Sequence, residues 1–262
     1  MKAKTVVLAS VFALALFLFA QHHNSPAQAT AFKTVVDLTH TVGPATPNYE
    51  ATPEPVFQAR TVGTVEKNGY FLREITLPEH FGTHIDAPAH FVQGLWTVEQ
   101  IPAERLVAPM VVIDVSKQAS SNADYQLSVD DIAGWEKTHG HIPQGAVVMA
   151  RTGWDSRWQS AQDYRNPDAK GVLHFPGYSV EAARFLVQGR NAIALGIDTL
   201  SVDYGPSKDY PVHKYTLSHS LYHLENVADL ARVPEFGATV VVAPMKLEGG
   251  SGGPVRILAL TK

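Results

Sequence analysis

The stretch from Leu106 to Arg151 decides the fold class of this chain. It opens with the apolar run LVAPMVVIDV (106–115) and closes with a second one, AVVMAR (146–151). Short runs rich in β-branched residues are typical of buried strands. The segment between them, SVDDIAGWEKT (128–138), begins with a serine, which favours the N-terminal cap of a helix. We therefore predict a strand–helix–strand unit here.

Further strands and helices flank this unit. A hairpin is predicted for Phe57–Val65 and Tyr70–Leu77, because both runs carry β-branched and aromatic residues around a Lys67-Asn68-Gly69 turn. Other predicted strands are Thr34–Leu38, Ala192–Ile197, Ala238–Ala243 and Val255–Leu260, and other predicted helices are Ser179–Gln188 and His213–Ser220. This order predicts one α/β domain with a mixed β-sheet and flanking helices.

Residues 1–29 are predicted to be a secretory signal peptide, which leaves residues 30–262 as the folded domain. Lys2 and Lys4 precede an almost unbroken apolar run from Thr5 to Ala20, and Ala27-Gln28-Ala29, or Ala29-Thr30-Ala31 two residues on, is a small-x-small cleavage pattern. A membrane anchor is the alternative, but this run of 16 residues falls short of the roughly 20 that a membrane-spanning helix needs. We expect a secreted or periplasmic protein without membrane attachment after cleavage.

Charge and composition exclude several classes of function. The net charge is −4 and becomes −6 when the two lysines of the signal are removed, so neither nucleic acid nor an anionic membrane is an expected partner. The chain has no cysteine, which excludes thiolate metal sites and thiol nucleophiles. Any bound metal must therefore be held by nitrogen and oxygen, and the 12 histidines are a source of such ligands.

The segment HFGTHIDAPAH (80–90) gathers ligand-type side chains. In an extended chain His80, His84, Asp86 and His90 have the same parity and project to one side. A helix is disfavoured by the prolines and the glycine in and around the segment. Three imidazoles and a carboxylate suit Zn(II), Mn(II) or Fe(II), so we predict a metal site. The alternative is that these are ordinary polar residues on a solvated face.

Residues 80–90 resemble the signature of the cyclase family, which includes bacterial kynurenine formamidases and isatin hydrolases. The pattern His-x-Gly-Thr-His-x-Asp-x-Pro-x-His is matched at every fixed position. A second family element, a histidine followed twelve residues later by glutamate, matches His213 and Glu225. Weaker likenesses are Asp37-Leu38-Thr39-His40, Gly196-Ile197-Asp198-Thr199 and GGSGGP (249–254). The resemblance runs from Val36 to Leu260 and implies a fold of the swivelling β/β/α type.

This resemblance implies a metal-dependent hydrolase with one or two divalent ions per chain. By the resemblance, His80, His84 and Asp86 ligate one ion, Mn²⁺ or Zn²⁺. Asp86 with His213 and Glu225 binds a second ion in formamidase-like members, whereas isatin hydrolases are expected to use a single manganese ion. The resemblance also implies a homodimer.

The expected reaction is hydrolysis of a small aryl amide by metal-activated water. A divalent metal lowers the pKa of its bound water to about 7 and polarises the carbonyl oxygen. The resemblance assigns His90 the acid/base role, for which an imidazole with an ordinary pKa of about 6.5 is suited. The substrate is expected to be a cyclic amide such as isatin or an N-formyl arylamine. The alternatives are a non-catalytic secreted metal-binding protein and a lyase or cyclase that uses the same site.

Aromatic residues are the predicted substrate contacts. Tyr49, Phe81 and Trp96 are candidates for stacking on an aromatic substrate, and Trp154 is a further one. Tyr49 stands where formamidases have a tryptophan, and the loop Asp203–Asp209 is more similar to the isatin-hydrolase branch.

Three other histidines are assigned supporting roles. His219 and His223 lie near the glutamate of the second element, and we interpret both as structural residues. His40 follows the first predicted strand within a family-like motif, and it is a candidate for a hydrogen bond to the site from outside the ligand set.

Overall fold

The predicted strand–helix–strand unit is present at the centre of the fold. The computed structural model describes residues 32–49 and 56–262, so the predicted signal peptide lies outside the described residues. Strand β5 (Val107–Asp114) leads through helix α4 (Val129–His139) to strand β7 (Val147–Arg151), which pairs with β5 in parallel. Ser128 caps α4 by accepting a hydrogen bond from the backbone N–H of Asp131, as its position in the sequence predicts.

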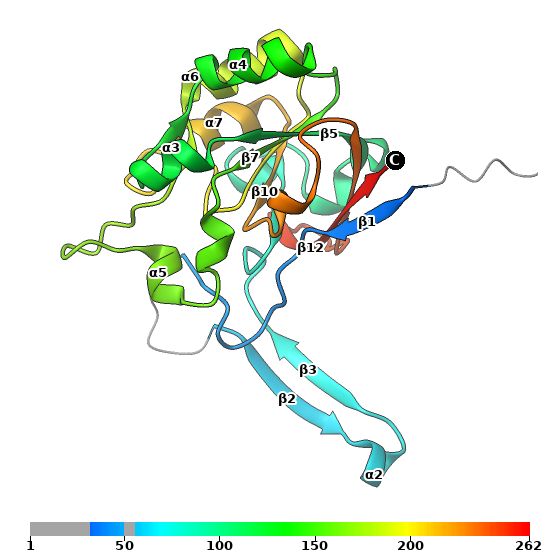
Figure 1. The fold of residues 1–262 in the computed structure, drawn as a ribbon. Coiled ribbons are helices and arrows are strands. Elements are labelled where there is room, and N and C mark those ends of the chain that lie inside the picture. Colours follow the sequence, from blue (N-terminus) through cyan, green and yellow to red (C-terminus); the bar gives the residue numbers. More distant parts are fainter. Residues whose placement is uncertain (1–31, 50–55) are drawn as a thin grey trace, which may run out of the picture. The chain divides into compact units, whose positions relative to one another are not determined.

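Within the described residues, eight strands form one mixed sheet that closes on itself (Figure 1). Its order is β1 (Thr34–Asp37), β12 (Gly252–Thr261), β11 (Ala238–Pro244), β5, β7, β9 (Ala194–Ile197), β10 (Tyr222–Glu225) and β4 (His84–Asp86). Strands β5, β7, β9 and β10 are parallel, and the remaining pairings are antiparallel. Strand β4 also pairs with the first residues of β12, which makes the sheet barrel-like.

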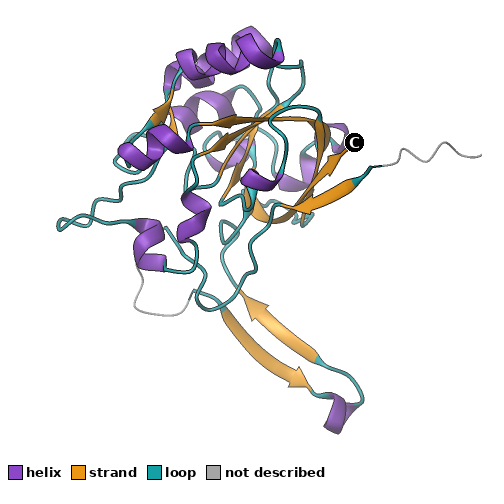
Figure 2. Cartoon of the chain, in the orientation of Figure 1, coloured by secondary structure: helices purple, strands orange, loops and turns teal. Residues whose placement is uncertain are grey.

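The closed sheet has an apolar core on each of its two faces. Along β5, Met110 and Val112 point to the inner face, whereas Val111 and Ile113 point to the outer face. This alternation follows from the two-residue period of a strand. The outer face is covered by helices, among them α4, α6 (Val180–Arg184) and α7 (Pro211–Ser218), which Figure 2 shows gathered on one side of the sheet. An α/β domain with a mixed sheet and flanking helices is thereby confirmed.

The predicted hairpin forms an arm beside the main sheet. Strands β2 (Gln58–Gly63) and β3 (Leu72–Thr76) pair only with each other, and the short helix α2 (Val65–Asn68) connects them. Every residue of β3 is exposed. Gly69 ends α2 with a φ of 76°, the left-handed conformation that a glycine adopts without strain.

The remaining elements are short. They are α3 (Ser116–Ser121), α5 (Ala161–Arg165), the paired strands β6 (Gln126–Leu127) and β8 (Gly177–Tyr178), a π-helical turn (Phe185–Gly189) that continues α6, and 3₁₀ turns at Pro88–His90, Val98–Gln100, Ala103–Arg105, Trp154–Arg157 and Leu230–Arg232. None of the helices in the described part of the chain is long and apolar enough to cross a membrane.

The prediction that residues 80–90 run as one extended segment is wrong. Only His84–Asp86 is a strand, and Pro88–His90 is a 3₁₀ turn. Gly82 breaks the extended path with a φ of 66°, and a Cβ at this position would lie 2.7 Å from Val42 Cγ2. The motif therefore bends at both ends, and its ligand-type side chains come together by a folded path instead of by shared parity alone.

Candidate metal centre

Two neighbouring strands supply four ligand-type side chains directly opposite one another. On β4, His84 and Asp86 share one face, while Ile85 between them points into the core. On β10, His223 is the register partner of Asp86, and Glu225 is the register partner of His84. Opposite residues of an antiparallel pair share a face of the sheet, so all four side chains converge. Each is at most 4% exposed.

His213 joins this group from the first turn of helix α7. Asp203 holds this end of the helix, because its carboxylate accepts hydrogen bonds from the backbone N–H groups of Val212 and His213, both at 3.0 Å. The same carboxylate lies 2.7 Å from His213 Nδ1. A proton on Nδ1 therefore leaves the lone pair of Nε2 directed toward the cluster, an arrangement common among metal-binding histidines.

His80 approaches the cluster from the loop before β4. Its Nδ1 lies 2.7 Å from Asp86 Oδ1, and its Nε2 lies 2.8 Å from the hydroxyl oxygen of Ser251. That hydroxyl donates to Glu79 Oε2 at 2.7 Å. His80 is less buried than the other ligand-type residues, with 25% of its side chain exposed.

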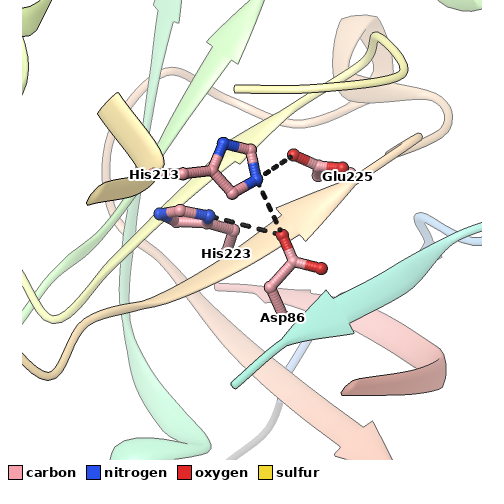
Figure 3. A group of neighbouring side chains, drawn as sticks. All are labelled: Asp86, His213, His223 and Glu225. Carbon is pink, nitrogen blue, oxygen red and sulfur yellow. Dashed lines mark ion pairs between the residues drawn. The ribbon is translucent and has the colours of Figure 1, made fainter. Parts of the chain in front are cut away.

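In each of the carboxylates of Asp86 and Glu225, one oxygen lies near His84 and the other lies near His213. His84 Nε2 lies 3.3 Å from Asp86 Oδ1 and 3.4 Å from Glu225 Oε2. On the other side, His213 Nε2 lies 3.4 Å from both Asp86 Oδ2 and Glu225 Oε1, and His223 Nδ1 lies 3.3 Å from Asp86 Oδ2 (Figure 3). Two sets of potential metal ligands thus share Asp86: His80, His84 and Asp86, and Asp86, His213, His223 and Glu225.

The protonation of these groups is dominated by their mutual contacts. Burial alone would raise the pKa of Asp86, but hydrogen bonds with the surrounding histidines hold it well below its usual range. Burial and the charge of Asp86 raise the pKa of Glu225, yet hydrogen bonds with His213 and His84 lower it to about 2. Burial lowers the pKa of His84, whereas hydrogen bonds with the two carboxylates raise it to about 10. The cluster therefore holds two buried negative charges that cations must neutralise.

The residues present fit a divalent metal. In a tetrahedral site with bonds of about 2.1 Å, ligand atoms lie about 3.4 Å apart, close to the 3.3–3.4 Å separations found here. Asp86 Oδ2 and His223 Nδ1 are also among the buried polar atoms of the described residues that have no hydrogen-bond partner. Such atoms are costly to bury unless a ligand satisfies them. Imidazole and carboxylate donors suit zinc, manganese or iron.

His90 lies beside the cluster at the end of the 3₁₀ turn. Its ring stacks on His80 with centroids 4.0 Å apart and lies 6.0 Å from the ring of His213. The residue is exposed toward a cavity, yet partial burial of the ring lowers its pKa to about 4. His90 is therefore neutral at neutral pH and can accept a proton.

An aromatic-lined cavity of about 570 Å³ opens above the cluster. Its described lining comprises Pro47, Asn48, Tyr49, Val56, Pro78, His80, Gly82, His84, Asp86, His90, Phe91, Leu200, Ser201, Tyr210, His213, Glu225 and Asn226. The hydroxyl groups of Tyr49 and Tyr210 lie 3.1 Å apart and share a hydrogen bond. The ring of Phe91 lies beside those of His213 and Tyr210, with centroid distances of 4.8 Å and 5.7 Å. The cavity thus offers aromatic walls and a polar, ligand-rich floor.

Comparisons with known proteins agree with this geometry. The Cyclase family profile matches residues 36–204. An isatin hydrolase from Roseibium aggregatum is 32% identical over 241 residues, which are 86% of this chain and 91% of the relative. A kynurenine formamidase from Salinibacter ruber is 26% identical over 85% of this chain and 95% of its own. The solved structure of isatin hydrolase A from Labrenzia aggregata bound to benzyl benzoate matches with a TM-score of 0.82 and 38% identity, over 87% of this chain and 93% of its own.

The chain belongs to the cyclase family. This membership confirms the sequence prediction of a metal-dependent hydrolase that acts on carbon–nitrogen bonds other than peptide bonds. As a cyclase-family protein it retains His80, His84, Asp86, His213 and Glu225 in one cluster, where the resemblance had assigned the metal ligands.

The three predicted substrate contacts of this chain lie in different environments. Tyr49 lines the cavity. Phe81 is 2% exposed, packs against Phe57 at a centroid distance of 6.4 Å and is not among the described lining residues. Trp96 also lies outside that lining, and the guanidinium of Arg105 sits 5.3 Å from its ring centroid. Phe81 faces the core because the left-handed bend at the next residue turns its side chain away from the ligands.

Two other predicted contacts lie away from the cavity lining. Trp154 is 2% exposed and donates a hydrogen bond from Nε1 to the backbone carbonyl of Tyr164 at 2.8 Å. The ring of His40 stacks on Trp158 with centroids 3.9 Å apart. Its backbone N–H donates to Thr83 Oγ1 at 3.0 Å, so His40 supports the ligand strand through its backbone instead of contacting a ligand with its ring.

His223, interpreted from the sequence as a structural residue, lies within the second group of potential metal ligands. His219, interpreted in the same way, is exposed at the end of α7. Tyr210 and Asp203 were not expected at the site. The sequence feature that could have indicated His223 as a site residue is its two-residue spacing from Glu225. This spacing places both side chains on one face only if the segment is a strand. No strand is predicted from the sequence at β10.

Proposed function

We propose that this protein hydrolyses a small, planar, uncharged aryl amide, a cyclic amide of the isatin type, with a water molecule activated at a divalent metal centre. The observation that carries this proposal is the convergence of buried histidines on Asp86 and Glu225 at the floor of an aromatic-lined cavity, with neutral His90 beside them. The metal is Mn²⁺ or Zn²⁺, because both accept imidazole and carboxylate ligands.

The chain's own residues supply position and proton transfer. A divalent ion held by these residues would lower the pKa of bound water and polarise the substrate carbonyl. His90, neutral because its pKa is lowered to about 4, takes up a proton as water adds to the carbonyl carbon. The same proton is then delivered to the nitrogen as the carbon–nitrogen bond breaks. Asp86 and Glu225 keep the ligand set anionic, and the walls of the cavity exclude water from the aromatic part of the substrate.

The lining of the cavity favours an uncharged substrate. Among the described residues that line it there is no lysine or arginine, and its charged groups are those of the ligand cluster. N-formylkynurenine carries an amino acid group with both charges, which would need polar partners on burial. A neutral bicyclic amide needs only the apolar faces of residues such as Tyr49, Phe91 and Tyr210. This contrast favours the cyclic amide over the N-formyl arylamine.

The test is a direct comparison of the two substrates. The chain from Thr30 onward, loaded with Mn²⁺ or Zn²⁺, is followed by absorbance with isatin and with N-formylkynurenine. We expect faster turnover of isatin, and a product heavier by one water. Preference for N-formylkynurenine would overturn the substrate class, and a product lighter by one water would indicate a lyase or cyclase. A His90→Ala variant with normal metal content but little turnover would exclude the non-catalytic metal-binding alternative.

Secretion and a homodimer are part of the same proposal. The n-region, apolar run and cleavage pattern of residues 1–29 support export to the periplasm or beyond. The hairpin arm exposes Tyr70, Phe71, Leu72 and Ile75, an apolar surface suited to a second copy of the chain. Amino-terminal sequencing of the exported protein tests secretion, and a retained residue 1 would refute it. Light scattering of the purified chain tests the homodimer, and a monomer at micromolar concentration would refute it.

A further inference from the structure

His223 has a ring whose two nitrogens are in different situations. The side chain is 0% exposed, and its strand position is directly opposite Asp86. Nε2 lies 2.6 Å from the hydroxyl oxygen of Thr216 on helix α7. Nδ1 has no hydrogen-bond partner, although it lies 3.3 Å from Asp86 Oδ2.

The hydrogen bonds of Thr216 determine which nitrogen carries the proton. Its hydroxyl donates to the backbone carbonyl oxygen of Val212 at 2.7 Å. A hydroxyl has one proton, so Thr216 Oγ1 acts as the acceptor toward His223, and Nε2–H donates. In the neutral ring Nδ1 then has only a lone pair. That lone pair faces a carboxylate oxygen of Asp86, and a metal ion bound by both atoms would remove the repulsion between these two acceptors.

The arrangement differs on the opposite side of Asp86. The hydroxyl of Ser251 donates to Glu79 and accepts from Nε2–H of His80, whereas Nδ1 of His80 has a hydrogen-bond partner in Asp86 Oδ1 at 2.7 Å. His84 and His213 are oriented the other way, with Nδ1 next to Gly82 O at 3.0 Å and next to Asp203 at 2.7 Å. Of these four histidines, only His223 presents a buried nitrogen without a hydrogen-bond partner to Asp86.

We propose that His223 is a metal ligand and that Thr216 is the residue that positions it, which completes a four-residue ligand set with Asp86, His213 and Glu225. The two ligand sets, His80, His84 and Asp86 on one side and Asp86, His213, His223 and Glu225 on the other, share Asp86. This inference deepens the proposed function and rests on its metal centre, not on its substrate.

The count of bound ions tests the inference without any assay of activity. The apo protein is loaded with excess Zn²⁺ or Co²⁺, desalted and analysed for metal per chain, and the second binding step is measured by calorimetry. We expect two ions in the wild type and in Thr216→Ser, which keeps the hydroxyl. We expect one ion in His223→Ala, and in Thr216→Val a second ion bound about 10- to 100-fold more weakly. His219→Ala, an exposed histidine at the end of the same helix, is the matched control and should bind two.

The inference fails if the wild type binds a single ion under these conditions. It also fails if His223→Ala and Thr216→Val bind a second ion with wild-type affinity. If His223→Ala does not fold, as judged by circular dichroism, His223→Gln fills most of the same space and carries the same expectation. Isatin turnover measured on the same samples separates the two proposals. If the protein binds two ions but does not turn over isatin, only the proposed substrate class is refuted. If it turns over isatin with one ion bound, only the second ion position is refuted.

Discussion

Replacement of Asp203 by asparagine is the perturbation whose effect follows most directly from the contacts. The Asp203 carboxylate is 1% exposed and accepts from three N–H groups: Val212 N and His213 N at 3.0 Å, and His213 Nδ1 at 2.7 Å. An asparagine side chain has one oxygen and one NH₂ group. One of the two oxygen positions would therefore carry a donor that faces N–H groups of the protein.

The size of the effect can be estimated from the bonds that are lost. A hydrogen bond to a charged group contributes about 1.5–3 kcal/mol. Loss of one such bond at His213 corresponds to a change of about 10- to 150-fold in an equilibrium constant, since 1.4 kcal/mol is a factor of about ten. The upper part of this range matches the 10–100-fold typical of residues that orient metal ligands. We therefore expect Asp203→Asn to weaken binding of the ion at His213 by at least tenfold.

The assay is calorimetric titration of metal-free protein with Zn²⁺, with metal retention after dialysis as a second readout. Asp209→Asn, an exposed acid in the same loop, is the matched control and should behave like the wild type. Wild-type affinity in Asp203→Asn would refute the reasoning that this carboxylate fixes the orientation of His213. A loss of affinity equal in both variants would point to a general change in charge instead.

Three further predictions follow from the site and its supporting loop. Because the pKa of His84 is raised to about 10, metal binding at pH 7 must displace a proton, and the affinity for metal falls as the pH falls. Calorimetry in buffers of different ionisation enthalpy should show this proton release, and binding heats that do not depend on the buffer would contradict it. His90→Ala should lower kcat about 10²- to 10⁴-fold with unchanged metal content, measured on metal-loaded protein, and a proportional loss of metal would instead give His90 a ligand role. Gly82→Ala should lower the free energy of unfolding by roughly 1–3 kcal/mol, because φ is 66° and the new Cβ would meet Val42 at 2.7 Å. Gly94→Ala has a similar φ of 84° with no atom within 4 Å, so thermal melting should show a smaller loss there.

The sequence was most informative where the determining interactions are local. The strand–helix–strand unit at residues 106–151 depends on apolar runs and a capping serine, and both are visible in the sequence. The motif at residues 80–90 was recognised from its residue types. Its path was predicted incorrectly, because Gly82 adopts a left-handed conformation that residue identity allows but does not demand.

Features that depend on distant parts of the chain were not predicted. Closure of the sheet requires β4 to pair with both β10 and β12, and no pattern within one segment reports such a pairing. The position of His223 was not predicted for the same reason, because it lies among the potential ligands only through the pairing of its strand with β4. Phe81 was placed in the substrate pocket because it lies within the motif, whereas packing against Phe57 keeps it in the core.

Strand β4 has a consequence for how the fold and the ions depend on each other. Its three residues are the only ones in the described sheet through which β10 and β12 are joined, and two of them are His84 and Asp86. An ion bound by Asp86 and by the histidines of β10 and α7 would cross-link β4 to β10 at the point where the sheet closes. Chelation would then leave two ionised acids repelling each other across the shortest strand of the barrel. The amides of β4 should exchange faster with solvent in metal-free protein, while those of β5 and β7 remain protected. In this architecture a bound ion would maintain the continuity of the sheet as well as supply the chemistry.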